Sequence, residues 1–425
     1  MAKKCKRFSP LKCIEMRHTF SKKERAVETM RMKTRICRPA LLGLLLCLLP
    51  WCSRGQQREE KQKHILIVLT HGMGDTCCDP LSIGKIERVI ERRSDADDTL
   101  KTKVISIKFG RNSMRDFISG FIGDAFSLVK DFGCAQLRNA KEEMMMMHRD
   151  FESTEKKNDD KVETILLGFS QGGVFARAMV ETCEDEVNAL ITFGAPHSGV
   201  WKFPGCDKMA NALSRKWCEY SRKVASKAAY SKMLKSKSVQ ASYFRDVSDA
   251  KRFEQYVRSG SLLSVINGEE DGSDEDDARG EERKRKMGQR RRREKMCNLD
   301  VFAMFSFEKD EVVVPRDSAV FSDAPSVPFE YTEEKSSELL NVRETKFYLN
   351  EEDGLCLREL DEKNRMKIDV VPDAHHMQFS LEWFTENVID KYIVAAPEKR
   401  EEEVKEEEEE DKKEGVIHSI NRFSK

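Results

Sequence analysis

TILLGFSQGG, residues 164–173, carries the strongest structural signal in this chain. An apolar run of strand length leads into the Gly-x-Ser-x-Gly pentapeptide around Ser170, and a helical pattern follows as far as Glu181. This pentapeptide between a strand and a helix is typical of a nucleophile elbow, whose glycines let the two elements pack closely around a strained serine. A serine at such a junction can also be a helix N-cap. Ser170 is therefore a candidate nucleophile that needs support from the rest of the sequence.

Short apolar runs alternate with helical patterns on both sides of this motif. Besides the run before Ser170, strands are predicted at residues 64–70, 104–107, 187–193, 299–307 and 367–371. The first of them leads into the glycine-rich turn His71-Gly72-Met73-Gly74-Asp75 and then into an amphipathic helix. Strands that alternate with helices favour a doubly wound α/β domain. We expect an α/β-hydrolase fold, with a mostly parallel sheet flanked by helices.

Charged segments interrupt this pattern and define the expected domains. Charged residues make up 35% of the chain, which is high for a compact globule. We expect the hydrolase domain to span residues 56–396, with a helical cap inserted at about 199–297. Within the cap, an acidic run followed by a basic run predicts a disordered, self-neutralising loop at 268–295. Residues 141–160 predict a smaller insertion, and residues 397–425 a charged, disordered tail.

Residues 1–55 have the composition of an N-terminal extension that contains a signal peptide. The apolar stretch at 39–49 follows several arginines. It is too short for a membrane span, which needs about 20 residues, but it suits the apolar region of a signal peptide. Translation from Met30 or Met32 would give this peptide an ordinary length, and an uncleaved signal anchor is the alternative. We expect a protein of the secretory pathway without a stable membrane span.

The composition also argues against several classes of function. Basic residues are concentrated in residues 1–55, so the rest of the chain is net acidic, which argues against nucleic-acid binding. The 13 cysteines fit an oxidising compartment, and they lack the Cys-x-x-Cys spacing of a metal site. We therefore expect no metal, no other cofactor and no nucleic-acid partner.

A serine nucleophile needs a base within hydrogen-bond reach. The candidates that follow the motif are His197, His375, His376 and His418. His418 lies in the charged tail, and His197 follows a strand end, where it is a possible pocket residue. The pair His375-His376 follows the last predicted strand and precedes an amphipathic helix, which is the usual position of the base. This position favours the pair, of which His376 is the expected base, and His375 could compete with it.

The base in turn needs an orienting carboxylate. Asp310 lies on the loop directly after the predicted strand 299–307, whereas Asp300 lies inside that strand and Asp317 lies farther from its end. The resulting order of Ser170, Asp310 and His376 is the chain order of an α/β-hydrolase triad.

An acyl-transfer enzyme must also stabilise an oxyanion. The backbone N–H of Gln171, directly after the candidate nucleophile, is one expected donor, and the second is the N–H of Met73 in the glycine-rich turn. The same turn could cradle a phosphate, but no P-loop Lys-Ser/Thr pair follows it.

Several motifs resemble the palmitoyl-protein thioesterases of the lysosomal type. They are His71-Gly72-Met73-Gly74-Asp75-Thr76-Cys77-Cys78, Gly168-Phe169-Ser170-Gln171-Gly172-Gly173, Ala229-Tyr230-Ser231-Lys232, His376-Met377-Gln378-Phe379-Ser380 and Glu382-Trp383-Phe384. The Gly-Met-Gly-Asp turn with tandem cysteines is unusual among α/β-hydrolases. The resemblance covers residues 63–392, interrupted by the two charged insertions.

This resemblance implies a serine hydrolase that removes palmitate or similar fatty acyl groups from S-acylated cysteines. S-acylated proteins or peptides and acyl-CoA would be the substrates, and a lysosome-like or vacuolar lumen, or the exterior, would be the compartment. The family's triad falls on Ser170, Asp310 and His376, and its oxyanion donors fall on Met73 and Gln171. Its disulfide pattern implies the pairs Cys77–Cys78, Cys134–Cys183 and Cys206–Cys218.

The chain also departs from the family pattern. His375 stands where an acidic residue precedes the base in known members, and no Asn-x-Ser/Thr glycosylation site occurs. Cys297 and Cys356 have no assigned partner.

Two further functions stay open, namely hydrolysis of lipids or small esters on the same fold and non-catalytic lipid binding. The acyl groove is expected beside Phe175, Tyr230, Tyr243 and Phe244, although these aromatic residues could equally form the core of the cap.

Overall fold

The structure, a computed structural model, describes residues 62–151, 162–202, 216, 237–270, 278–350 and 355–395. All of them belong to one unit, Glu59–Lys425. The predicted signal peptide, the charged tail, Cys206, Cys218, Tyr230 and His418 lie outside the described residues.

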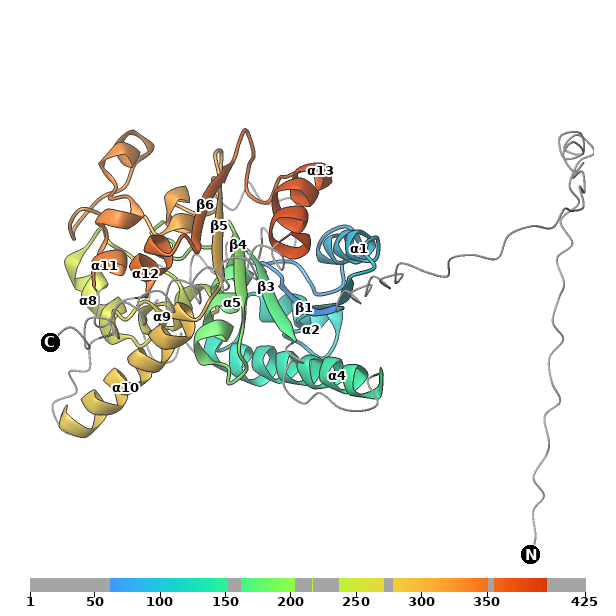
Figure 1. The fold of residues 1–425 in the computed structure, drawn as a ribbon. Helices are drawn as coiled ribbons and strands as arrows, with labels where there is room; N and C mark the ends of the chain where they lie inside the picture. Colours follow the sequence, from blue (N-terminus) through green and yellow to red (C-terminus); the bar gives the residue numbers. More distant parts are fainter. Residues whose placement is uncertain are drawn as a thin grey trace, which may run out of the picture. The chain divides into compact units, whose positions relative to one another are not determined.

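A six-stranded sheet forms the centre of this unit, in the order β2-β1-β3-β4-β5-β6 (Figure 1). Every pair of neighbouring strands is parallel. The strands are β1 (Lys63–Thr70), β2 (Leu100–Ser106), β3 (Glu163–Phe169), β4 (Ala189–Phe193), β5 (Val301–Phe307) and β6 (Met366–Val371). The predicted parallel α/β-hydrolase sheet is confirmed, although β2 begins four residues before the predicted 104. The strand was missed there because its first residues, Leu100-Lys-Thr-Lys, are mostly polar. Such residues are tolerated because β2 lies at the edge of the sheet and pairs with β1 alone.

Helices cover both faces of the sheet because successive side chains of a strand point to opposite sides. On β1, Leu66 and Val68 belong to one core cluster, and Ile65 and Ile67 belong to the other. The first cluster includes residues of α4 (Ala135–Phe151), α5 (Gln171–Thr182), α9 (Leu262–Ile266) and α10 (Ala278–Cys297). The second includes residues of α1 (Ile83–Ser94), α13 (Leu381–Phe384) and the π-helical η7 (Thr385–Val394) (Figure 1).

The remaining helical elements within the described ranges are short. They are α2 (Ser113–Ser119), α3 (Ala125–Ser127), the π-helical η1 (Leu128–Cys134), η3 (Gln240–Ser242), α8 (Ala250–Arg258), η4 (Arg316–Val320), η5 (Glu333–Glu338), η6 (Val342–Glu344), α11 (Lys346–Leu349) and α12 (Leu357–Glu362).

The predicted disordered loop at 268–295 is wrong over most of its length. Helix α10 occupies Ala278–Cys297, and only residues 271–277 of the predicted loop lie outside the described residues. The smaller insertion predicted at 141–160 is also partly helix, because α4 continues to Phe151 with Met144 buried against the core.

Helix α10 is stabilised by one packing face, which its many charged residues conceal in the sequence. Gln289 and Met296, seven positions apart, are buried, and Arg292 lies on the same face. The Nη2 atom of Arg292 donates to the Val265 carbonyl at 3.1 Å, and its Nε lies 4.0 Å from the Glu181 carboxylate of α5. Arg, Lys, Gln and Glu are also good helix formers. The mean charge of the segment concealed this periodicity.

Three disulfides tie the described elements together. Cys77 is joined to Cys78 and Cys134 to Cys183, which are two of the pairs that the family resemblance implied. Cys297, the last residue of α10, is joined to Cys356, the N-cap of α12. The sequence alone gave no partner for these two residues, because 58 residues separate them and only the packing of α10 brings them together.

A buried ion-pair network connects residues 245–269 to residues 323–346. The guanidinium of Arg245 donates to both carboxylate oxygens of Asp323, at 2.7 and 3.0 Å, and to Oε1 of Glu269 at 2.9 Å. The Nζ atom of Lys346 on α11 lies 2.6 Å from the same Glu269 oxygen. Burial by itself would raise the pKa of Glu269, but the charges of Arg245 and Lys346 outweigh it and lower that pKa to about 2.

Candidate active site

Ser170 lies at the turn between β3 and α5 in a strained backbone conformation. Its φ is 56° and its ψ is −126°, a region that non-glycine residues rarely adopt. The neighbouring glycines permit this turn: a Cβ on Gly168 would lie 2.4 Å from the Gly173 Cα, and one on Gly172 would lie 2.3 Å from the Thr70 carbonyl oxygen. The Ser170 side chain makes no capping hydrogen bond with α5, so the N-cap explanation of this serine is not supported.

His376 links Ser170 to Asp310 through its two ring nitrogens. Its Nε2 lies 2.8 Å from the Ser170 Oγ, and its Nδ1 lies 2.6 Å from the Asp310 Oδ2. Oδ1 of Asp310 accepts hydrogen bonds from the backbone amides of Val312 and Val313, at 2.8 and 3.0 Å. With the carboxylate fixed in this way, the proton of the ring belongs on Nδ1, and Nε2 is free to accept the Ser170 proton.

The loops that carry these residues leave the sheet at one edge. Ser170, Asp310 and His376 follow β3, β5 and β6, and the carboxyl ends of parallel strands share an edge. Asp310 is almost fully buried, whereas the His376 side chain is 12% exposed. His376 and Ser170 therefore lie nearer to the surface than Asp310 does.

The other residues weighed from the sequence lie apart from this arrangement. His197 is fully buried, stacks on Phe321 at 4.8 Å and places its Nε2 2.9 Å from the Thr192 hydroxyl. Burial and the charge of Arg177 hold the pKa of His197 well below its usual value, so this ring is neutral and structural.

The remaining candidates have structural or solvent contacts. His375 is exposed and contributes its backbone carbonyl to the turn before Gln378. Asp300 accepts a hydrogen bond from the Asn188 side chain at 3.3 Å. Asp317 is partly buried within η4, where burial raises its pKa.

The glycine-rich turn after β1 lies against the candidate nucleophile. A Cβ on Gly72 would lie 3.1 Å from the Ser170 Cβ and 3.7 Å from its Oγ. The backbone of this turn therefore lies directly beside Ser170. Gln171 is the first residue of α5, where an amide has no intrahelical acceptor.

Sequence reasoning missed the side chains that contact Gln171 and the glycine-rich turn. The side-chain oxygen of Gln171 accepts hydrogen bonds from the Tyr243 hydroxyl at 2.9 Å and from Nε2 of Gln240 at 3.2 Å. His71 and Asp116 form a buried pair beneath the glycine-rich turn, with 3.2 Å between Nε2 and Oδ1. Asp116 is the only acidic residue of α2, and no sequence pattern distinguished it.

Three of the aromatic residues expected beside the acyl groove are buried, and the fourth, Tyr230, lies outside the described residues. Phe175, Tyr243 and Phe244 are 1%, 6% and 5% exposed. Phe175 packs edge to face with Phe109 at 5.1 Å, so it supports α5 rather than lining a groove. The alternative assignment to core packing holds for these three residues.

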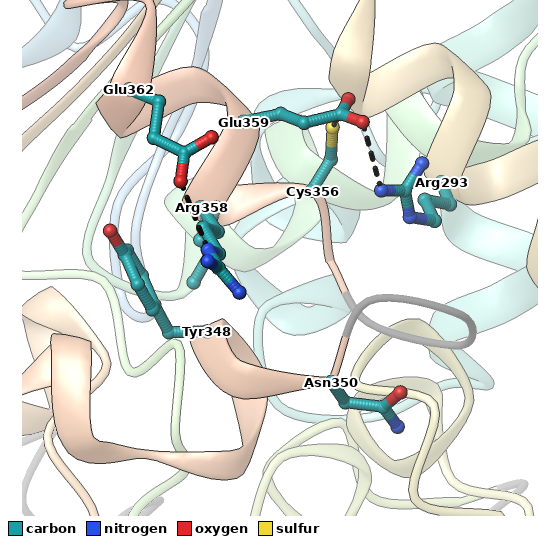
Figure 2. Close-up of a pocket in the computed structure, with 8 residues that line it drawn as sticks. Arg293, Tyr348, Asn350, Cys356, Arg358, Glu359 and Glu362 are labelled. Atoms are coloured by element: carbon teal, nitrogen blue, oxygen red, sulfur yellow. Dashed lines mark hydrogen bonds and ion pairs between the residues drawn. The ribbon is translucent and has the colours of Figure 1, made fainter.

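A separate cavity of about 360 Å³ lies beside the Cys297–Cys356 disulfide (Figure 2). Its lining is polar, with ion pairs between Arg293 and Glu359 at 3.3 Å and between Arg358 and Glu362 at 3.0 Å. The lining residues are Arg293, Tyr348, Asn350, Cys356, Leu357, Arg358, Glu359 and Glu362. None of them belongs to the triad arrangement, and two ion pairs make this cavity unsuitable for a fatty acyl chain.

Within the described ranges, one group of three side chains could share a metal ion, namely Cys297, Cys356 and Glu359, but the disulfide removes the thiolates that would bind it. No described helix is long and apolar enough to cross a membrane.

Comparisons with known proteins agree with this geometry. A family model described as palmitoyl protein thioesterase matches residues 66–376, from β1 through His376. The chain is 26% identical over 352 residues to palmitoyl-protein thioesterase 1 of Caenorhabditis elegans, covering 83% of this chain and 98% of that protein.

Two further relatives match shorter parts. The lysosomal thioesterase PPT2 homolog of Drosophila melanogaster is 26% identical over 222 residues, covering 52% of this chain and 63% of that protein. Palmitoyl-protein thioesterase 3 of Dictyostelium discoideum is 25% identical over 202 residues, covering 47% of this chain and 57% of that protein. Since the family model spans most of the chain, from the first strand of the sheet to the histidine beside Ser170, this chain belongs to the palmitoyl protein thioesterase family.

Proposed function

We propose that this chain removes palmitate and similar long-chain fatty acyl groups from S-acylated cysteines through an acyl-serine intermediate. The observation that carries the proposal is the hydrogen-bonded chain Asp310–His376–Ser170, with distances of 2.6 and 2.8 Å, in a member of the palmitoyl protein thioesterase family. S-acylated proteins or peptides and acyl-CoA are the proposed substrates.

The first half of the reaction forms the acyl-enzyme. The Ser170 Oγ attacks the thioester carbonyl while Nε2 of His376 takes its proton, and Asp310 stabilises the imidazolium that results. The Met73 and Gln171 amides donate hydrogen bonds to the tetrahedral oxyanion. The carbon–sulfur bond then breaks, and the leaving cysteine sulfur takes the proton from His376.

The second half releases the fatty acid. A water molecule gives a proton to His376 and attacks the acyl carbon, which forms a second oxyanion at the same two amides. The bond to the Ser170 Oγ breaks, and His376 returns the proton to that oxygen. The cycle consumes one water and yields a free thiol and a carboxylic acid, so it needs no metal or organic cofactor.

The substrate class is tested with two acyl donors that share one palmitoyl chain, a thioester and an oxygen ester. We expect kcat/KM to be at least about tenfold higher for the thioester, because a thiolate leaves more readily and the family acts on acylated thiols. Steady-state kinetics of the purified full chain give both values. Comparable values would instead favour a lipid or small-ester hydrolase, and a folded but inactive chain would favour non-catalytic lipid binding.

The proposed compartment is a lysosome-like or vacuolar lumen, or the exterior. The relative named a lysosomal thioesterase and the disulfides of this chain support a lumenal setting. N-terminal sequencing of the mature protein tests this assignment, and a chain that begins upstream of Met30 would contradict the proposed signal peptide.

A further inference from the structure

His71 is a buried ionisable residue that the proposed chemistry does not use. It precedes the glycine-rich turn, and its side chain is 1% exposed. Its Nδ1 lies 3.1 Å from the Gly72 carbonyl oxygen, and its Nε2 lies 3.2 Å from the Asp116 Oδ1. The ring of Phe109 packs edge to face against it at 5.4 Å.

Both neighbours of the His71 ring nitrogens are hydrogen-bond acceptors. A carbonyl oxygen has no proton to give, and the Asp116 carboxylate already accepts from the backbone amides of Phe109 at 2.6 Å and Cys77 at 2.8 Å. A neutral imidazole carries one N–H and can satisfy only one of these neighbours, whereas an imidazolium satisfies both. The geometry is therefore that of a protonated ring.

The charges around His71 favour the same state. The ionisable groups that face it are Asp116 on α2 and Asp75 on the glycine-rich turn, and both are acidic. Burial by itself would lower the pKa of His71, but the hydrogen bond and charge of Asp116, together with the Gly72 carbonyl and Asp75, outweigh burial and leave that pKa raised.

The Gly72 carbonyl belongs to the same peptide unit as the Met73 amide. Among the described residues the cis peptide bonds are Val314-Pro315 and Val327-Pro328, so the Gly72–Met73 peptide is trans. In a planar trans peptide the C=O and N–H bonds point in opposite directions. A hydrogen bond that fixes the Gly72 carbonyl on one side therefore fixes the direction of the Met73 N–H on the other.

From this geometry we infer that His71 is a positioning residue: its imidazolium, held by Asp116, orients the Met73 N–H toward the oxyanion. The inference rests on the proposed function, because this amide matters only if Ser170 attacks an acyl carbonyl. Loss of the His71 proton removes either the Gly72 or the Asp116 hydrogen bond. Turnover therefore requires a protonated His71 together with an unprotonated His376, and the activity has an alkaline limb set by His71.

Two substitutions separate the two ring nitrogens. The side-chain amide of Asn lies near the position of the ring Nδ1, so His71→Asn keeps a donor for Gly72 and does not titrate. The longer Gln reaches the position of Nε2, so His71→Gln keeps the Asp116 contact and loses the side-chain donor for Gly72, which then keeps only the longer hydrogen bond from the Asp75 amide at 3.4 Å. Both variants are neutral and similar in size, which makes each the control of the other.

We expect His71→Gln to lower kcat by about 10- to 100-fold, part of the 10²- to 10³-fold that loss of a whole oxyanion donor costs, with KM within about twofold of wild type. We expect His71→Asn to keep kcat within about fivefold of wild type and to lack the alkaline limb. The measurements are kcat and KM for a palmitoyl thioester between about pH 5 and pH 9, with urea unfolding of each variant.

Several results would overturn the inference. They are equal losses of kcat in the two variants, an effect confined to KM, an alkaline limb that persists in His71→Asn, a wild-type profile without such a limb, or a loss that follows unfolding. Nitrogen NMR of the wild-type ring gives a readout independent of turnover, and a neutral His71 at pH 6 would also refute it. A wild type that hydrolyses no thioester would refute the proposed function and this inference with it. An active wild type whose His71 variants keep its kcat and its pH profile would refute the inference alone.

Discussion

Replacement of Ser170 by alanine is expected to lower kcat for palmitoyl-thioester hydrolysis by at least about 10³-fold while the fold stays intact. The Ser170 Oγ is the atom that contacts His376, and it is also the atom that would form the acyl-enzyme bond, so alanine removes both interactions. Alanine adopts the strained backbone of the elbow about as readily as serine does, so the free energy of unfolding should change little. Turnover kinetics and urea unfolding measure the two quantities.

Two other variants sharpen this result. In Asp310→Asn the side-chain oxygen can still accept from Val312 and Val313, but an NH2 group faces the His376 Nδ1 and imposes the wrong tautomer. We expect a loss of about 10³- to 10⁴-fold in kcat. Ser326→Ala, a substitution of an exposed serine, should leave kcat unchanged. A Ser170→Ala protein that retained wild-type turnover would remove Ser170 from the mechanism.

The second large effect concerns stability. Arg245→Ala should lower the free energy of unfolding by about 3–5 kcal/mol, because it leaves the buried Asp323 carboxylate without its counter-charge. The matched control is Arg258→Ala, whose ion pair with Glu254 is more than half exposed and should contribute less than about 1 kcal/mol. Urea unfolding at neutral pH compares the two variants, and equal midpoints would contradict the assigned role of the network.

The pH dependence of this effect follows from Glu269. The charges of Arg245 and Lys346 overcome the effect of burial and lower its pKa to about 2 in the folded chain, below the value of about 4.3 for an unfolded glutamate. A carboxylate with a lowered pKa stabilises the fold above its unfolded pKa, and that contribution is lost as the pH falls toward the folded pKa. The difference between wild type and Arg245→Ala should therefore shrink between about pH 5 and pH 2.

The sequence predicted the sheet and the Ser170–Asp310–His376 order because these depend on local signals. Short apolar runs identify buried strands, and a glycine-flanked serine between a strand and a helix has few other uses. The choice of Asp310 over Asp300 and Asp317 followed from strand ends, which is where a parallel sheet presents its site.

The features that sequence reasoning missed depend on tertiary contacts. Helix α10 looked disordered because its buried face, which includes Gln289 and Met296, is a small part of a highly charged segment. The Cys297–Cys356 disulfide depends on where that helix ends. The pairing of His71 with Asp116 joins residues 45 positions apart, and no periodicity connects them.

The central claim is that Ser170 carries the acyl group during turnover. Its most direct test is to mix the full chain with a palmitoyl thioester, quench the first turnover in acid and locate the acyl adduct by peptide mass spectrometry. We predict a palmitoyl group on the Ser170 side chain that forms as fast as the free thiol is released and then decays as palmitate appears. Thiol release at the wild-type rate without an adduct on Ser170, or with an adduct on another residue, would contradict the account.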